Sequence, residues 1–236
     1  MRPAPLFELD AAELPDEPEE LWQLFDLLNI ACGGHAGDQA SMARALAACK
    51  RHGIAAGAHP SYPDRDGFGR RTLAMLPSEV EASVITQCDA LLRATRLTGI
   101  DAITHLKPHG ALYHDAARDR ALADAVIRGA RQRLGDVIVI GPPTGELAAA
   151  SRVAGLRYLR EGFADRGTRP DGSLIPRGES GALITDPEAA ATRARALVGQ
   201  VDALCVHADT PGALAIASAV RAALTSATGI GASHNV

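Results

Sequence analysis

The sequence predicts a single α/β domain in which seven parallel strands alternate with helices and close into a TIM-like barrel. Short apolar runs alternate with longer alanine-rich stretches along the chain. The short runs are apolar at successive positions, as strands buried on both faces are. The chain has 236 residues, a length that α/β barrels reach without dividing into domains. We therefore treat residues 1–236 as one domain.

The predicted strands are short, and the apolar pattern is least clear in the first of them. No apolar run reaches about 18 residues, so no membrane span is expected. The predicted strands are Leu6–Leu9, Leu27–Ala31, Ile54–Ala58, Ala102–Leu106, Val137–Ile140, Tyr158–Arg160 and Leu204–Val206.

The predicted helices have consistent boundary signals. Asp186-Pro187 and Thr210-Pro211 each place a capping residue before a proline that suits the first helical position. Gly53 and Gly99 fall just past helix ends, where glycine is favoured. The predicted helices lie near residues 39–52, 78–98, 116–134, 145–154, 187–199 and 212–227. Two long irregular stretches, Pro60–Leu76 and Gly162–Ile184, are expected to be functional.

Composition excludes several classes of protein. The net charge is -4 and no Lys/Arg-rich stretch occurs, so nucleic acid is not an expected partner. Only Lys50 and Lys107 are lysines, and no GxxxxGK[ST] phosphate-binding loop is present. The acidic, proline-rich N-terminus lacks the features of a signal peptide. The four cysteines form no CxxC pair, so we expect a reduced, cytoplasmic protein without a membrane partner.

Polar side chains gather directly after the predicted strands. In a parallel barrel the carboxyl ends of the strands converge on one face, and that face carries the catalytic groups. If the eight histidines were placed at random along the chain, they would not be expected to fall at the ends of four strands. The polar clusters are Cys32–Asp38, His59–Asp64, His105–Tyr113, Gly141–Glu146, Glu161–Arg166 and His207–Asp209.

These residues suit two kinds of chemistry. Histidines, carboxylates and a lysine together suit general acid–base work on a small polar substrate. Histidine and carboxylate side chains are also zinc ligands, and His35, His59 and His109 are the candidate metal ligands. No HExxH or similar local signature is present, so spacing does not decide whether a divalent metal is bound.

Several of the residues also have a purely structural interpretation. Asp38 precedes a predicted helix and could be only its N-cap. His59 could be a buried histidine bonded to backbone, and Lys107 could be an exposed, salt-bridged lysine. Glu161 and the Asp165-Arg166 pair could form a structural ion network.

Taken together, the motifs resemble the LamB/YcsF family, to which the A subunit of the prokaryotic ATP-dependent 5-oxoprolinase belongs. The resemblance covers about residues 27 to 224, and residues 1–26 diverge. The matching motifs are Asn29–Asp38, Gly57–Asp64, Phe68–Arg70, Lys107–Tyr113, Glu161–Arg166 and Asp171–Arg177.

The resemblance implies a fold, a reaction and partners. The fold is a seven-stranded relative of the β/α barrel, of the glycoside hydrolase/deacetylase type. The reaction opens the lactam of 5-oxoproline to L-glutamate with ATP hydrolysis, and Mg²⁺ is expected with the ATP. The family works with two partner subunits.

The residues permit a mechanism for that reaction. Lys107 and Arg166 would neutralise phosphoryl or oxyanion charge. Histidines would move protons, and Asp38 or Asp165 would orient them or hold Mg²⁺. The predicted catalytic residues are His35, Asp38, His59, Lys107, His109, Asp165 and Arg166. The predicted substrate-binding residues are Tyr62, Arg70, Tyr113, Glu161, Arg177, His207 and Asp209.

Two departures from the family pattern leave alternatives open. The family motif Asp-Leu-Asn-Ala-Asp-Leu-Gly-Glu corresponds here to Phe7–Pro15, with Asp10 at the position of the Asn. Ala12 replaces the second Asp unless a shifted Glu13 substitutes, and Ala208 replaces the glycine of a late His-Gly-Asp. The altered strand admits a non-catalytic lactam-binding subunit as an alternative. The broader barrel relatives admit a metal-dependent, deacetylase-like C–N hydrolase.

Overall fold

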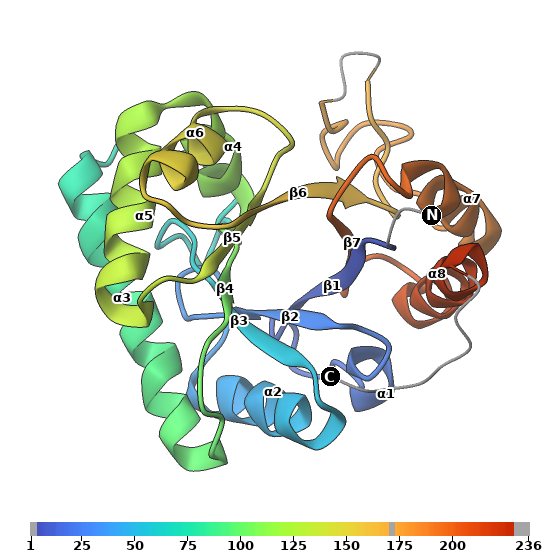
Figure 1. Ribbon diagram of the computed structural model, residues 1–236, viewed down its shortest axis with the longest axis horizontal. Helices are drawn as coiled ribbons and strands as arrows, with labels where there is room; N and C mark the ends of the chain where they lie inside the picture. Colours follow the sequence, from blue (N-terminus) through green and yellow to red (C-terminus); the bar gives the residue numbers. More distant parts are fainter. Residues whose placement is uncertain (1–3, 170–172, 229–236) are drawn as a thin grey trace.

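Seven parallel strands form a closed barrel in sequence order, and the last strand pairs with the first. The computed structural model describes residues 4–169 and 173–228, and Figure 1 shows the strands at its centre with helices outside. The predicted fold class is confirmed. The strands are β1 Leu6–Ala11, β2 Leu27–Ala31, β3 Ala55–His59, β4 His105–Leu106, β5 Ile138–Gly141, β6 Tyr158–Phe163 and β7 Ala203–His207.

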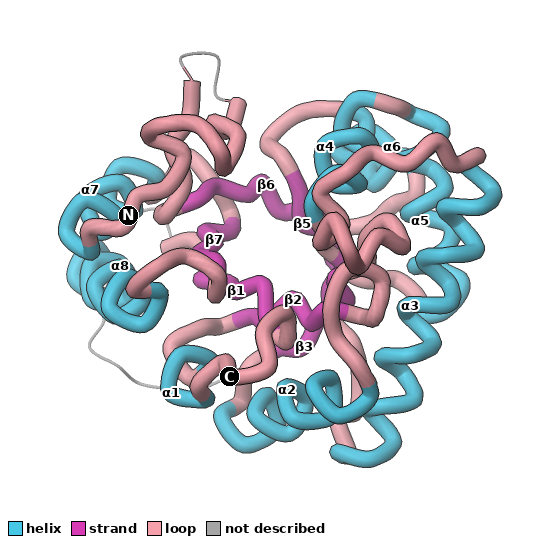
Figure 2. The backbone as a smooth tube through the Cα atoms, turned by 180° about the vertical axis from the view of Figure 1, so that it is seen from behind, coloured by secondary structure: helices cyan, strands magenta, loops and turns pink. Residues whose placement is uncertain are grey.

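Helices cover the outside of the barrel. Seen from behind in Figure 2, α3 to α6 lie on one side of the strands and α7 and α8 on the other. No helix among the described residues is both long and apolar enough to cross a membrane. The helices are α1 Glu19–Trp22, α2 Gln39–His52, α3 Pro77–Thr98, α4 Gly110–Arg118, α5 Arg120–Leu134, α6 Glu146–Val153, α7 Pro187–Leu197 and α8 Ala213–Thr228.

One predicted helix and one predicted helix cap are wrong, each because a polar side chain has another role. The single helix predicted near 116–134 is two helices, since Asp119 is extended and its carboxylate accepts from the backbone N–H of Ala121 at 2.7 Å. The Thr210 hydroxyl does not cap α8, which begins at Ala213. It donates to Asp165 instead, at 2.5 Å. The caps at Asp186, Gly53 and Gly99 are confirmed.

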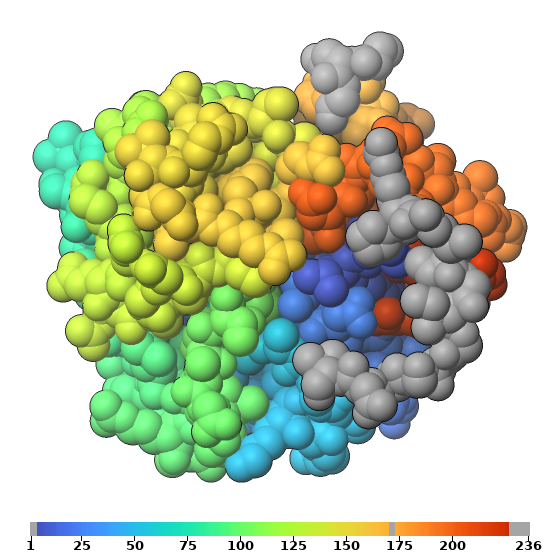
Figure 3. Space-filling view, viewed as in Figure 1, coloured from blue at the N-terminus to red at the C-terminus, as the bar shows by residue number. Residues whose placement is uncertain are grey.

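Hydrophobic side chains fill both sides of the strands near their amino ends. The main core includes Phe7 and Leu9, which face the helices. A second, smaller cluster consists of Leu27, Ile140, Leu159 and Ala203 from four strands. In the space-filling view of Figure 3, the blue N-terminal segment lies against the orange segment that precedes α8, where the barrel closes. The polar groups described next therefore lie toward the carboxyl end of the barrel.

Candidate active site at the carboxyl end of the barrel

Two buried carboxylates on β1 point into the barrel. Glu8 and Asp10 occupy alternate positions of the strand and so share one face, opposite to Phe7 and Leu9. Both are buried, and the Asn29 side-chain amide donates to each of them at 3.0 Å. Sequence reasoning did not select either residue as catalytic. The available signal was a pair of acidic residues at alternate positions of an otherwise apolar strand.

Lys107 lies at the centre of the carboxylates. Its Nζ is 2.5 Å from Glu161 Oε1 and 2.7 Å from Asp10 Oδ1, and the residue is only 2% exposed. Burial alone would lower the pKa of Lys107, but the surrounding negative groups, Asp10 foremost, raise it well above its usual value. The lysine is therefore a buried cation, and the alternative of an exposed salt bridge is wrong.

The carboxylates around Lys107 differ in protonation. Burial raises the pKa of Glu8 well above its ordinary value, and the neighbouring Glu161 adds to the effect although Lys107 opposes it. Burial also acts to raise the pKa of Asp10, but His59 and Lys107 outweigh it and hold that pKa well below the ordinary value. The protonated form is therefore favoured at Glu8 and the ionised form at Asp10.

A second buried cluster joins Glu13 to three histidines. One side-chain atom each of Glu13, His35, His59 and His109 lies within 4.8 Å of all the others. Burial lowers the pKa of His35 to about 3, with help from His109, and burial also lowers the pKa of His109. Glu13, the shifted carboxylate considered for the altered first-strand motif, therefore lies buried among these histidines.

A loop clamped by Glu17 positions Glu13. The Glu17 carboxylate accepts hydrogen bonds from the backbone N–H groups of Ala12, Glu13 and Leu14 at 2.7–2.8 Å. It also accepts from Trp22 Nε1 at 2.9 Å. Ala12 has a positive φ of 60°, a strained conformation for a residue with a Cβ that persists only where surrounding contacts enforce it.

The irregular stretch Pro60–Leu76 packs against His109 and orients its ring. His109 Nε2 lies 3.0 Å from the Phe68 carbonyl oxygen. Gly110 follows with a φ of 58°, and a Cβ there would lie 2.4 Å from the Gly69 carbonyl oxygen. Only glycine permits this close approach, which explains the glycine directly after His109.

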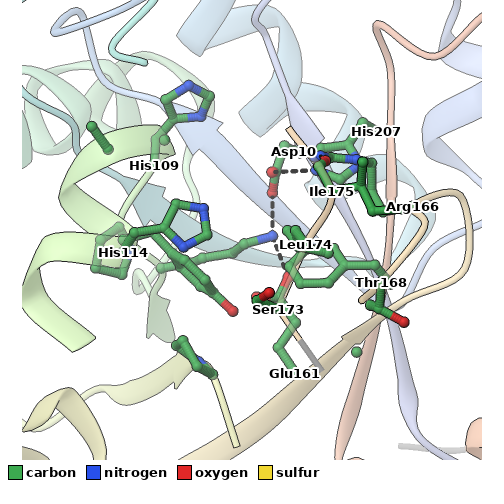
Figure 4. A pocket seen from close by; sticks show the side chains of 18 of the residues that line it. Asp10, His109, His114, Glu161, Arg166, Thr168, Ser173, Leu174, Ile175 and His207 are labelled. Carbon is green, nitrogen blue, oxygen red and sulfur yellow. Dashed lines mark hydrogen bonds and ion pairs between the residues drawn. The ribbon is translucent and has the colours of Figure 1, made fainter. Parts of the chain in front are cut away.

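His207 and Asp165 form an oriented pair at the wall of the site. Asp165 accepts from the His207 backbone N–H at 3.0 Å and lies 3.0 Å from His207 Nδ1. His207 Nε2 faces the cavity, 3.9 Å from Asp10 Oδ2, and Figure 4 shows the two side chains pointing toward one another. Burial alone would lower the pKa of His207, but Asp165 raises it. Asp165 therefore fixes the orientation of the His207 ring.

Arginines gather at the mouth of the cavity. Arg70 and Arg177 flank Asp209, with nitrogen–oxygen distances of 2.6 and 2.9 Å. Arg166 donates to the backbone carbonyl oxygens of Ala182 and Ile175. Burial lowers the pKa of Arg166, and the nearby Arg177 and Arg70 lower it further. Positive charge is therefore in excess at the mouth.

A cavity of about 960 Å³ connects these groups. Tyr113 lines it, and burial together with Glu161 raises the pKa of Tyr113 well above its ordinary value, so it remains a hydroxyl donor. The predicted site residues that line the cavity are His59, Arg70, Lys107, His109, Tyr113, Glu161, Arg166, Arg177 and His207.

The remaining predicted site residues lie elsewhere. Asp38 is exposed and caps α2, accepting from the Ser41 N–H at 2.8 Å, so its capping alternative is confirmed and a role in catalysis finds no geometric support. Tyr62 is buried behind the cavity and donates to Asp115 at 3.2 Å. His35 lies behind His109, with the two rings stacked at 3.6 Å. Asp171, in the last matching motif, lies outside the described residues.

Comparison with known proteins gives consistent matches over most of the chain. The sequence pattern of the LamB/YcsF family matches residues 13–233. A protein from Methylococcus capsulatus, named as the A subunit of 5-oxoprolinase, is 42% identical over 219 residues, 87% of this chain and 84% of that protein. A protein of the same name from Chloroflexus aggregans is 44% identical over 213 residues, 84% of each chain.

Solved structures match the fold as well. The lactam utilization protein from Thermus thermophilus superposes with a TM-score of 0.86 at 36% identity, covering 95% of this chain and 97% of that one. The Xyl-CE4 domain of a multidomain xylanase from the hindgut metagenome of Trinervitermes trinervoides superposes with a TM-score of 0.50 at 11% identity, over 96% and 84% of the two chains. This second likeness concerns the fold alone.

Proposed function

The chain belongs to the LamB/YcsF family, and we propose that it is the A subunit of a 5-oxoprolinase. In this proposal it opens the lactam ring of 5-oxoproline to L-glutamate with hydrolysis of ATP, together with two partner subunits. The observation that carries the proposal is the buried Lys107 ammonium, held between Asp10 and Glu161 on the floor of the cavity. Proton donors and arginines surround it in the same cavity.

The need for ATP follows from the chemistry of the substrate. Amide resonance makes a lactam a poor electrophile, and transfer of a phosphoryl group to its carbonyl oxygen removes that resonance. Water then adds to the activated carbon, and the ring carbon–nitrogen bond breaks as the nitrogen takes a proton. The acyl phosphate that remains is hydrolysed by a second water to the carboxylate and inorganic phosphate. Lys107 and Arg166 are the cations that would neutralise the developing charge.

Protons can move through His207. Asp165 raises the pKa of His207, which favours the protonated imidazole, and in that form the side chain can donate a proton to the lactam nitrogen as a general acid. Asp165 is the positioning residue, because it contacts His207 and is fully buried behind it. Asp10, ionised and 3.9 Å from His207 Nε2, is placed to orient the attacking water.

The cavity mouth suits an anion. Arg70, Arg166 and Arg177 outnumber the single carboxylate of Asp209, and guanidinium groups bind carboxylate and phosphate oxygens well. The α-carboxylate of 5-oxoproline and the phosphates of Mg²⁺-ATP both fit this chemistry. No GxxxxGK[ST] loop occurs in the sequence, so we place the nucleotide at this mouth or at a partner interface.

The decisive experiment measures the ring-opened product formed by the chain assembled with its two partner subunits, glutamate from 5-oxoproline and 4-aminobutyrate from 2-pyrrolidinone. Reactions contain 5-oxoproline or uncharged 2-pyrrolidinone, each with and without Mg²⁺-ATP. The proposal expects release from 5-oxoproline that depends on ATP and produces one phosphate per glutamate. Ring opening without ATP would favour a deacetylase-like hydrolase instead. Calorimetric binding of 5-oxoproline without turnover in the complete assembly would indicate a non-catalytic subunit.

A further inference from the structure

We propose that Glu13, His59 and His109 bind one divalent transition-metal ion, most favourably Zn²⁺, with His35 completing the site. The ring opening proposed above does not require an ion at this position, so the inference goes beyond it. All four residues are at least nine-tenths buried, and their ligand atoms lie within 4.8 Å of one another.

Backbone carbonyl oxygens determine which ring nitrogens of His59 and His109 carry a proton. His59 Nδ1 lies 2.7 Å from the Lys107 carbonyl oxygen, and His109 Nε2 lies 3.0 Å from the Phe68 carbonyl oxygen. A carbonyl oxygen only accepts hydrogen bonds, so the ring nitrogen facing it carries the proton. When such a ring is neutral, its other nitrogen carries a lone pair.

Those two lone pairs face each other. His59 Nε2 is 2.9 Å from His109 Nδ1, and the Glu13 carboxylate oxygen is 3.0 Å from the same His109 nitrogen. With both rings neutral, three acceptor atoms converge in this buried space. Such an arrangement is repulsive unless a cation occupies it, and no lysine or arginine side chain forms an ion pair with Glu13 among the described residues.

The spacing of the ligand atoms fits a metal ion. Zinc binds histidine nitrogen at about 2.0–2.1 Å, which places tetrahedral ligand atoms about 3.3 Å apart. The measured separations are 2.9 Å between His59 and His109, 3.0 Å between His109 and Glu13, and 3.6 Å between His59 and Glu13. Two of these separations are shorter than the tetrahedral value and one is longer, so small side-chain shifts would match the three atoms to one ion.

His35 needs a ring rotation to become the fourth ligand. Its Nε2 is 3.0 Å from Glu13 Oε1, but its ring is parallel to that of His109 within 2°. Lone pairs of parallel rings do not converge on one point. The other ring nitrogen of His35 is buried without a hydrogen-bond partner, so no hydrogen bond at that nitrogen opposes the rotation.

The surroundings resemble those of metal-binding histidines. Such histidines usually donate their second N–H to a carbonyl or carboxylate, which fixes the ring, and His59 and His109 both do so. Glu17 holds the backbone of Glu13 in place. Imidazole and one carboxylate favour zinc-like ions over Mg²⁺ or Ca²⁺, which prefer oxygen ligands. When bound, such an ion would polarise a carbonyl or activate water.

The test is direct metal binding by the tag-free full-length chain. The protein is stripped with a chelator, titrated with Zn²⁺ and, separately, with Co²⁺, and analysed by mass spectrometry of the elements and by the visible absorption of the cobalt form. We expect one ion per chain and the strong absorption of tetrahedral Co²⁺. Glu13→Gln and His109→Gln should each weaken binding by at least about tenfold.

A surface pair provides the matched control. His52 Nε2 lies 2.7 Å from Glu19 Oε1 outside the barrel, so His52→Gln and Glu19→Gln remove the same chemical groups elsewhere and should leave metal binding unchanged. His35→Gln is a further variant if Glu13→Gln does not fold. Substoichiometric metal with no tetrahedral cobalt spectrum in the wild-type chain, or equal loss in the surface variants, would overturn the proposal. Glutamate release does not enter this readout, so the two proposals can fail separately.

Discussion

The Lys107 ammonium lies 2.7 Å from the Asp10 carboxylate, although the two residues are 97 positions apart in the chain. Lys107 follows the fourth strand and Asp10 lies on the first, so this contact crosses the interior of the barrel. It places a buried cation beside carboxylates whose pKa values shift in opposite directions, that of Glu8 upward and that of Asp10 downward. The same ion pair therefore contributes to the stability of the barrel and belongs to the proposed active site.

Replacement of Lys107 should lower both the activity and the stability of the protein. Lys107→Ala removes the cation proposed to stabilise the developing charge, so kcat in the assembled complex should fall at least ~10²-fold. It also leaves Asp10 and Glu161 buried without their partner, which should lower the free energy of unfolding by roughly 3–5 kcal/mol. Steady-state glutamate release and urea unfolding measure the two effects. Lys50→Ala changes the only other lysine, which is exposed, and activity equally low in that control would contradict the assignment.

The pair of His207 and Asp165 should control a pH dependence. The folded-state pKa of His207 is raised above 6.5, so the stability from this pair is complete below about pH 6.5 and is lost as the pH rises through the folded pKa. Asp165, with a lowered pKa, adds stability above about pH 3.8 that is lost on further acidification. Urea unfolding should show the largest destabilisation by Asp165→Asn between these limits and a smaller one in alkaline solution.

The same variant should change the activity profile. A general acid must be protonated, so wild-type kcat should fall as the pH rises through the His207 pKa. Asp165→Asn removes the group that raises that pKa, and the fall should move to lower pH. Its position in a kcat–pH profile is the measurement, and an unchanged midpoint in the variant would remove His207 from the proton transfer.

Arg177 should recognise the substrate carboxylate. Arg177→Gln removes a guanidinium at the cavity mouth, so KM for 5-oxoproline should rise about tenfold or more, in line with the loss of a charge-assisted hydrogen bond. The response to 2-pyrrolidinone, which lacks the carboxylate, should not change. Arg195→Gln removes an arginine paired with Glu188 on α7 and serves as the control. An equal change for both lactams would assign Arg177 to another role.

Glu17 should act through the position of Glu13. Glu17→Gln keeps the size of the side chain but removes one of the two acceptor oxygens that four donors share. The free energy of unfolding should fall by about 1–3 kcal/mol. Trp22 is the only tryptophan and donates to this carboxylate, so its fluorescence reports the loop directly. Unchanged stability and unchanged emission would show that the clamp is dispensable.

Asp38 should affect stability alone. Asp38→Ala removes the N-cap of α2 and should lower the unfolding temperature by only about 2–4 °C. Asp186→Ala removes the equivalent cap of α7, where the carboxylate accepts from the Ala189 N–H at 2.7 Å, and should have a similar effect. Glutamate release at a temperature below both transitions should remain at the wild-type rate. A specific loss of activity in Asp38→Ala would restore the catalytic assignment.

Much of the fold followed from local sequence patterns. Apolar runs separated by capped helices predicted a parallel barrel, and the caps at Gly53, Gly99 and Asp186 were correct because they depend only on neighbouring backbone. The four-residue helix α1 gave no periodic signal. Asp119 and Thr210 were misjudged because the same side chain can cap a helix, break one or bond a distant carboxylate.

The sequence likewise predicted part of the candidate site, and the folded structure was needed for the rest. The order of residues along the chain was enough to show that histidines, a lysine and arginines follow the strands, since parallel strands deliver their carboxyl ends to one face. The folded arrangement was needed to show that Glu8, Asp10 and Glu13 join them, that Asp165 stands behind His207, and that Asp38 stays outside. Charge and protonation depend on burial and on partners across the barrel, and neither can be read from neighbours in the chain.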